Sequence, residues 1–114
     1  MSQARKHRGY ATQRLLADYL RQHGFPHAEP VGAGRTGSDI TGLLGIDIEV
    51  KARAGFNPSA ALAQLWERAC EGVLPMAVLR LNGQGPASID NWCVLLRLED
   101  ATQLIRDAGY GDPK

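Results

Sequence analysis

The residues best able to carry chemistry lie in one stretch of the sequence, from Ser38 to Arg53. Within it, Asp47, Glu49 and Lys51 alternate with apolar residues from position 46 onward. This period of two is typical of a strand with one buried and one polar face. We therefore expect the three charged side chains to point in the same direction.

Asp39 belongs to a second, shorter strand expected over residues 39–41. If a loop of residues 43–45 joins the two strands, with Gly45 at positive φ, Asp39 falls directly opposite Glu49. The Cβ atoms of such partners lie about 5 Å apart. Two carboxylates this close both stay ionised only beside a cation, so the spacing predicts a divalent metal with oxygen ligands.

Lys51 would bring a positive charge to the same face. Two carboxylates, a divalent ion and an ammonium group are the components needed to hydrolyse a phosphodiester. The alternative is an amphipathic hairpin whose charged face is simply solvated, which is common in sheets with one face toward water. Alternation alone leaves both interpretations open.

Asp39, followed after a loop of this length by Glu49-Val50-Lys51, closely resembles the core signature of the PD-(D/E)XK nucleases. Within that superfamily it resembles the compact branch similar to Holliday junction resolvases. Ser38 stands where the family name has proline, a departure often seen in relatives. The resemblance covers roughly residues 5–108 and rests on this short motif together with the order of the elements.

The resemblance implies a magnesium-dependent endonuclease, with Mn²⁺ able to substitute. Asp39, Glu49 and the backbone carbonyl of Val50 would hold one or two ions, and Lys51 would orient the attacking water or stabilise the transition state. Asp47 would be an outer ligand. The implied substrate is branched DNA, above all four-way junctions, cut by a homodimer. Two alternatives remain: a nicking or repair nuclease of the same superfamily, and a non-catalytic DNA-binding module on the same fold.

Two glutamines occupy positions where related nucleases often place site residues. Gln13, at the core edge of the first helix, lies near a position that often holds a metal-binding Glu. Because an amide keeps an oxygen but loses the charge, we expect a water-mediated role there. Gln64 matches a polar position on the helix after the Glu-Xaa-Lys strand. For each, the alternative is an ordinary surface glutamine.

Side chains suited to phosphate contacts surround this stretch. They are Arg5, Lys6, Arg8, Arg14, Arg35, Thr36 and Arg53. Residues 1–53 hold eight Lys and Arg against five Asp and Glu, a net +3, whereas the remainder holds five against seven, a net −2. A basic half that carries the site suits a polyanionic partner, although a solvated basic terminus is the alternative.

Periodicity and turn residues predict the remaining elements. They are helices over residues 7–23, 58–72 and 99–108, and strands over residues 76–81 and 91–98. The last strand has two largely apolar faces, which suits an interior strand or one that faces a dimer partner. Together these elements predict an α/β fold with a central mixed β-sheet flanked by helices, in the α-β-β-α-β-β-α order of the restriction-endonuclease-like core.

Composition limits the class of protein. The 114 residues, 44% apolar and 22% charged, predict one domain over residues 1–114, with residues 1–6 and 110–114 frayed. We find neither an apolar run of membrane-spanning length nor a signal peptide, which favours the cytoplasm of a bacterium or a phage-infected cell. Cys70 and Cys93 lack zinc-site spacing and are expected as partly buried thiols.

Residues 32–37 spell G-x-G-x-x-G, the pattern of a dinucleotide fingerprint. That fingerprint must follow a strand and open a helix, but here a strand pattern comes next. We therefore expect no nucleotide cofactor, and interpret residues 31–37 as a flexible loop that delivers Asp39.

Overall fold

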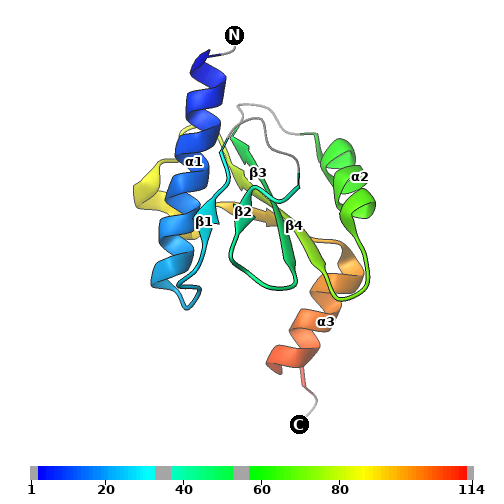
Figure 1. Ribbon diagram of the computed structural model, residues 1–114. Helices are drawn as coiled ribbons and strands as arrows, with labels where there is room; N and C mark the ends of the chain where they lie inside the picture. Colours follow the sequence, from blue (N-terminus) through cyan, green and yellow to red (C-terminus); the bar gives the residue numbers. More distant parts are fainter. Residues whose placement is uncertain (1–2, 33–36, 53–56, 113–114) are drawn as a thin grey trace.

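A three-stranded mixed sheet lies between two helices, α1 and α2, that cover its opposite faces (Figure 1). The computed structural model describes residues 3–32, 37–52 and 57–112. The sheet contains β3 (Ile46–Ala52), β4 (Leu74–Arg80) and β5 (Cys93–Leu95). β3 and β4 run parallel, and β5 pairs antiparallel with β4. The predicted α/β class, with a mixed sheet flanked by helices, is confirmed.

Helix α1 (Gln3–Gln22) packs the predicted apolar stripe against the sheet. Leu16 and Ala17 are buried in one core with Ile48 of β3 and Val78 of β4. The helix begins at Gln3 rather than at residue 7, so the predicted start is wrong. Those first residues are mostly strong helix formers, and so they extend the helix.

Helix α2 (Pro58–Arg68) begins as predicted, with the Asn57 side chain accepting a hydrogen bond from the Ala60 amide at 3.2 Å. It ends at Arg68 rather than at residue 72, because the backbone of Ala69 is already extended. Only Ala61 and Leu65 of this helix are buried. The other large apolar residues of the helix, Leu62 and Trp66, are exposed.

The parallel pair β3 and β4 is connected through α2, the crossover that parallel strands require. Residues in register in such a pair point to the same face, so Glu49 and Lys51 share a face with their β4 partners Ala77 and Leu79. Ala77 and Leu79 are buried. This face is the one covered by α2.

The predicted hairpin between residues 39–41 and β3 is wrong in its pairing. β2 (Ile40–Thr41) instead forms a separate two-stranded antiparallel sheet with β1 (Glu29–Pro30). β1 was not predicted, because a two-residue strand that contains proline leaves no periodic pattern. The loop between β2 and β3 has four residues, 42–45, rather than three, and Gly45 has the expected positive φ of 79°.

Gly42, at the start of that loop, is required by both conformation and space. Its φ is +89°, and a Cβ atom there would lie 1.8 Å from the carbonyl oxygen of His27. Only glycine allows the β2–β3 loop to approach the chain that leaves α1 so closely. This contact places the start of β3.

Strand β4 begins two residues earlier than predicted, and β5 is shorter than the expected strand over residues 91–98. The residues before β5 form a 3₁₀ helix, η1 (Pro86–Asn91), and those after it enter a helix. β5 pairs only with β4 in the described sheet, and Val94 is 50% exposed. The interior-strand interpretation is therefore wrong. Cys70 and Cys93 are both exposed, contrary to the expected partial burial, because one follows the end of α2 and the other lies on this edge strand.

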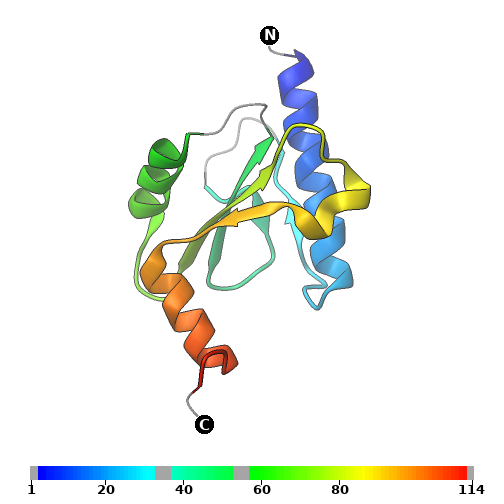
Figure 2. The ribbon, with the colours of Figure 1, turned by 180° about the vertical axis from the view of Figure 1, so that it is seen from behind.

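Helix α3 (Leu98–Ala108) projects away from the sheet, at the opposite end of the molecule from the start of α1 (Figures 1 and 2). None of its residues is buried. Arg97 anchors its first turn by donating to Asp100 at 2.7 Å while stacking on the Trp66 ring at 4.7 Å. As predicted, the helix stops at a glycine, Gly109, whose backbone is left-handed.

Candidate active site

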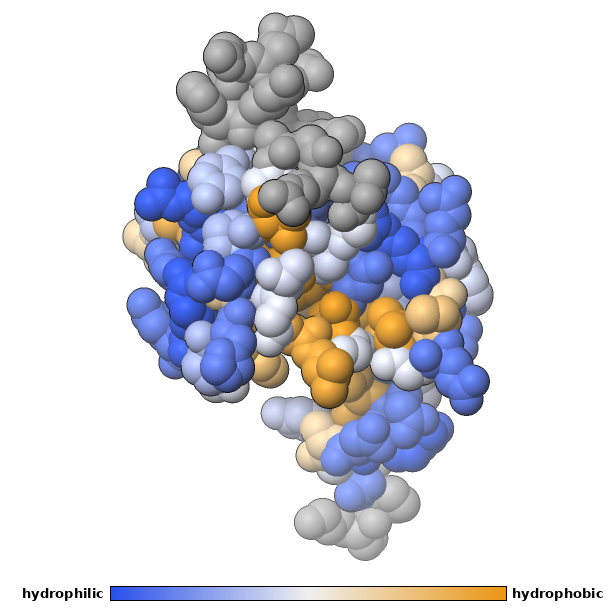
Figure 3. Space-filling view, in the orientation of Figure 1, coloured by the Kyte–Doolittle hydropathy of each residue, from blue (hydrophilic) through white to orange (hydrophobic). Residues whose placement is uncertain are grey.

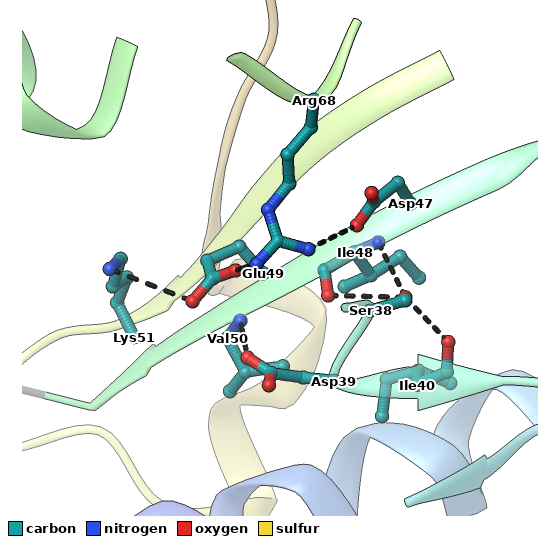
Figure 4. A network of polar contacts seen from close by, with 9 residues as sticks. All are labelled: Ser38, Asp39, Ile40, Asp47, Ile48, Glu49, Val50, Lys51 and Arg68. Carbon is teal, nitrogen blue, oxygen red and sulfur yellow. Dashed lines mark hydrogen bonds and ion pairs between the residues drawn. The ribbon is translucent and has the colours of Figure 1, made fainter. Parts of the chain in front are cut away.

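Asp47, Glu49 and Lys51 project from one face of β3 toward α2, as the alternation predicts (Figure 4). We call these three residues the charged face of β3. The Glu49 side chain lies at its centre, with Lys51 Nζ 3.8 Å from Glu49 Oε2. The side chains of Glu49 and Lys51 are each only 16% exposed. They therefore do not lie on an open, solvated surface, which was the alternative interpretation.

Asp39 and Ser38 bind the free edge of β3 through their side chains (Figure 4). The Val50 amide donates to Asp39 Oδ2 at 2.8 Å, and the Ile48 amide donates to Ser38 Oγ at 2.9 Å. The Asp39 amide in turn donates to the Ile48 carbonyl at 2.7 Å. These side-chain oxygens take the place of the carbonyls of a neighbouring strand. Asp39 therefore lies beside residues 48–50, next to Glu49, but without the backbone pairing of the predicted hairpin.

Asp39 nevertheless lies close enough to Glu49 to affect its ionisation. Burial raises the pKa of the Glu49 carboxyl above its ordinary value, and the negative charge of Asp39 raises this pKa further. Arg68 and Lys51 act in the opposite direction, and Asp47 adds a smaller upward effect. The net result is a buried carboxylate whose charge is not fully compensated by its protein neighbours.

Arg68, in the last turn of α2, makes the closest contacts to this face. Its Nη1 lies 2.9 Å from Asp47 Oδ1 and its Nη2 lies 3.1 Å from Glu49 Oε1. No sequence pattern assigned Arg68 to the site. The sequence signal that could have identified it is its position four residues after Gln64, on the same side of the helix. Its pairing with β3 depends on how the crossover helix packs on the sheet, and local periodicity does not reveal this packing.

Glu49 Oε1 is the atom that best fits a metal ion. It is buried and, over residues 3–32, 37–52 and 57–112, accepts no hydrogen bond, because the Arg68 guanidinium is near it but not aligned to donate. Buried carboxylate oxygens normally have a partner, and a hard cation would supply one. The atom therefore has free acceptor capacity within a negatively charged setting.

The other predicted ligands are compatible with this position. Asp39 uses only Oδ2 in its bond to Val50, which leaves Oδ1 to bind elsewhere. A strand residue presents its N–H and C=O to the same edge, so the Val50 carbonyl faces the edge where Asp39 lies. In the part of the chain that the structure describes, no three His, Cys, Asp or Glu side chains cluster as a ligand set. The carboxylates of Asp39 and Glu49 are hard oxygen donors of the kind through which Mg²⁺ binds, with water or phosphate completing its shell.

Gln13 is 8% exposed, so the surface-glutamine alternative is wrong and the predicted place at the core edge is confirmed. Its Oε1 accepts a hydrogen bond from the Gly32 amide at 3.0 Å. That oxygen therefore holds the chain at the beginning of the glycine-rich segment. A water-mediated role at the metal stays a prediction.

Gln64 is half-buried on α2, one turn before Arg68 on the same side of the helix. Four residues advance a helix by about 6 Å. Helix α2 runs antiparallel to β3 within the crossover. The step from Arg68 back to Gln64 therefore leads from the level of Asp47 and Glu49 toward that of Lys51. Gln64 is thus placed near the Glu49–Lys51 end of the site.

The predicted phosphate-binding residues are only partly described. Arg14 is exposed on α1, and Arg8 donates from Nε to the Ala52 carbonyl at 3.3 Å, at the end of β3. Arg5 and Lys6 lie in the first turns of α1, but their side chains fall outside the described part of the structure. Arg35, Thr36 and Arg53 fall outside the described residues altogether.

Arg80, which the sequence analysis did not single out, extends the positive charge near Arg8. Burial lowers the pKa of Arg80, and the charge of Arg8 lowers it further. Arg80 donates to Thr12 Oγ1 at 3.0 Å and lies over the Trp92 ring at 5.6 Å. Two arginines therefore meet at the end of β3 and β4 that follows Lys51.

Comparisons with protein-family models, with curated proteins and with solved structures found no match to this chain. Among the helices that the structure describes, none combines the length and apolar character needed to cross a membrane.

Proposed function

We propose that this protein is a metal-dependent DNA endonuclease of the PD-(D/E)XK type, built on a restriction-endonuclease-like core. The observation that carries the proposal is the buried Glu49 carboxylate, whose Oε1 accepts no hydrogen bond within the described residues, beside Lys51 and Asp39. A carboxylate with this surplus of negative charge and an ammonium group at 3.8 Å suit the hydrolysis of a phosphodiester.

In this proposal Asp39, Glu49 and the Val50 carbonyl hold Mg²⁺, or Mn²⁺ in its place. The ion, when bound, supplies Lewis acidity and lowers the pKa of a bound water. Lys51, held beside Glu49 and largely buried, donates hydrogen bonds to a phosphate oxygen and stabilises charge that develops there. Gln64, one turn before Arg68 on α2, would help to orient the reacting groups. Gln13 acts at a distance by fixing Gly32.

The proposed substrate is branched DNA such as a four-way junction, cut by a homodimer in the cytoplasm of a bacterial or phage-infected cell. Support for a polyanionic partner comes from the net +3 of residues 1–53 and from the exposed Arg14 on α1. Support for a second copy comes from the exposed apolar side of α3, on which Leu98 is 82% exposed. The selectivity for branched DNA rests on the resemblance of the motif.

Two other functions stay open as rivals. One is a nicking or repair nuclease of the same superfamily, which would use the same residues on a different DNA structure. The other is a DNA-binding module without catalysis. One observation favours this second rival. The Asp39 carboxylate accepts a hydrogen bond from the Val50 amide, so it would be retained even in a protein that binds no metal.

A cleavage assay separates these candidates. The purified protein is incubated with a four-way junction, a flap and a linear duplex, each in Mg²⁺, in Mn²⁺ and in EDTA. We expect symmetric cuts in the junction with either metal and none in EDTA. Preferential cutting of the flap or duplex would favour the first rival, and binding without cleavage under every condition would overturn the nuclease proposal.

A further inference from the structure

The Arg68 guanidinium already occupies the part of the site where a cation is needed. It bridges Asp47 and Glu49 with contacts of 2.9 and 3.1 Å, from the last turn of α2 (Figure 4). The three side chains are between 16% and 26% exposed, so solvent screens these contacts less than it screens pairs on an open surface. A positive charge here offsets part of the repulsion among the carboxylates of β3.

A guanidinium and a divalent ion that contact the same carboxylate oxygen repel each other at short range, so a metal ion on Glu49 Oε1 favours the departure of Arg68. Glu49 Oε1 is the atom nearest Arg68 Nη2, and it is also the buried atom that accepts no hydrogen bond among the described residues. Arg68 therefore neutralises charge without satisfying that oxygen as an acceptor. A metal ion would do both, which gives it a reason to displace the arginine.

We propose that Arg68 is a built-in counter-ion that competes with the divalent metal for Glu49 and, once displaced, binds a phosphate of the DNA. This inference rests on the proposed function. Arg68 can move without breaking the sheet, because it lies at the end of α2, where the next residue is already extended. A planar, permanently charged guanidinium is well suited to bind phosphate after its release.

The first test measures metal binding without any cleavage. Free Mn²⁺ is followed by electron paramagnetic resonance during titration of the wild type, Arg68→Ala and Arg68→Lys. Because removal of the guanidinium frees Glu49 and Asp47, we expect Arg68→Ala to bind Mn²⁺ roughly tenfold more tightly than the wild type. Arg68→Lys should fall between the two, since one ammonium group cannot bridge both carboxylates as the fork does.

Arg21 offers a matched control. It also bridges two acids, Asp18 and Glu29, but on the surface near the end of α1. Arg21→Ala removes the same charge and the same kind of contact, and its Mn²⁺ affinity should equal that of the wild type. Circular dichroism checks that all variants are folded.

The second test measures DNA binding by fluorescence anisotropy with a labelled four-way junction, in Ca²⁺ and in EDTA. We expect Arg68→Ala to weaken binding roughly fivefold more than Arg21→Ala in Ca²⁺ but equally in EDTA, where Arg68 is held by β3. Equal losses for the two variants in both conditions would overturn the phosphate contact.

The outcomes distinguish this inference from the proposed function. Equal Mn²⁺ affinity of the wild type and Arg68→Ala, or weaker binding by the variant, overturns the competition and leaves the nuclease proposal standing. If neither protein binds Mn²⁺ at millimolar concentration, the proposed function itself fails, and the inference fails with it.

Discussion

Glu49 combines three properties that ordinary surface glutamates lack. It is largely buried, it faces two cations, and one of its oxygens accepts no hydrogen bond among the described residues. Burial and the charge of Asp39 raise its pKa, which means that the folded protein disfavours its ionised form. A residue whose ionised form destabilises the fold in this way is expected to serve function rather than stability.

Glu49→Gln is expected to abolish cleavage while keeping or tightening the binding of DNA. The amide is nearly isosteric, but it removes a charge that repels phosphate and attracts metal. We expect a loss of at least about 100-fold in cleavage rate, measured under single-turnover conditions in Mg²⁺. The variant should unfold at a temperature no lower than the wild type, because it no longer buries that charge. Retained cleavage would remove Glu49 from the mechanism.

Gln13→Ala tests the role of the hydrogen bond to Gly32. We expect a partial loss of cleavage rate, about 5–30-fold, since the anchor of the segment before Asp39 loosens by about 1–2 kcal/mol. Gln13→Glu keeps the accepting oxygen and should retain more of the rate. An unchanged rate in Gln13→Ala would show that this anchor has no influence on the site.

Gly42→Ala should destabilise the fold strongly, because its Cβ atom would meet the His27 carbonyl at 1.8 Å. We expect a loss of roughly 3–5 kcal/mol in the free energy of unfolding, measured by urea denaturation. Gly83 is a matched control: its φ is +87°, but nothing lies within 4 Å of the added atom. Gly83→Ala should cost only about 1 kcal/mol, the conformational part alone. Similar losses for both variants would contradict the close approach of Gly42.

Sequence periodicity was sufficient to predict the charged face of β3, because a strand fixes the direction of every second side chain. It also predicted that Asp39 comes near this face. It could not show how Asp39 pairs with β3, since Ser38 and Asp39 bind this strand through their side chains, which no alternation encodes. Arg68 was missed for a related reason: its partners lie across a helical crossover, 19 and 21 positions away in the chain.

Among the helices and strands, α3 is the element whose apolar side is left exposed. Leu98, Leu104 and Ile105 are 82%, 43% and 51% exposed, and they share one side of the helix with Ala101 and Ala108. Figure 3 shows that apolar surface also gathers beside this helix, near the middle of the molecule. Over residues 3–32, 37–52 and 57–112, nothing buries this apolar side.

We expect a second copy of the chain to cover this side of α3. The double variant Leu104→Glu with Ile105→Glu should convert a dimer into a monomer, because four carboxylates would meet in the interface. Sedimentation equilibrium gives the molecular mass. As a control, Thr102→Glu with Gln103→Glu adds the same charge to the polar side and should leave the dimer intact. A wild-type protein that remains monomeric at about 100 μM would contradict this assignment.

The whole molecule is slightly extended for its length. Its Cα radius of gyration is 14.6 Å, whereas about 13.3 Å is typical of a compact domain of this size. The difference agrees with the projection of α1 and α3 at opposite ends (Figure 2). One end therefore carries the basic start of α1, and the other carries the apolar side of α3.

This separation predicts that the α1 end governs the salt dependence of DNA binding. Arg14 is exposed further along the same helix, and removing one phosphate contact should lower the slope of log K against log salt by about 1. Arg14→Ala should show that change in anisotropy titrations between 50 and 200 mM salt, roughly the range in which phosphate contacts dominate. Arg21→Ala serves as the control, because it removes the same charge from a position where the arginine is paired with two acidic side chains. Identical slopes for Arg14→Ala and the wild type would place the DNA elsewhere.

Element types and order were predictable at this scale because the long helices and β3 and β4 have strong periodic patterns. The short strand β2 was predicted over residues 39–41, but β1 and η1 were not, since two or six residues with proline carry no period. The exposure of α3 was also beyond the sequence. An amphipathic pattern shows that a face needs cover, but not which molecule supplies it.

The side-chain bonds of Ser38 and Asp39 to β3 also have an evolutionary consequence. A descendant that lost cleavage would still need Asp39, because the Val50 amide would otherwise lose its partner. Glu49 is not required for stability in this way, and selection for stability alone would replace it. Among relatives of this chain, substitution at Glu49 rather than at Asp39 would be the first trace of an abandoned activity.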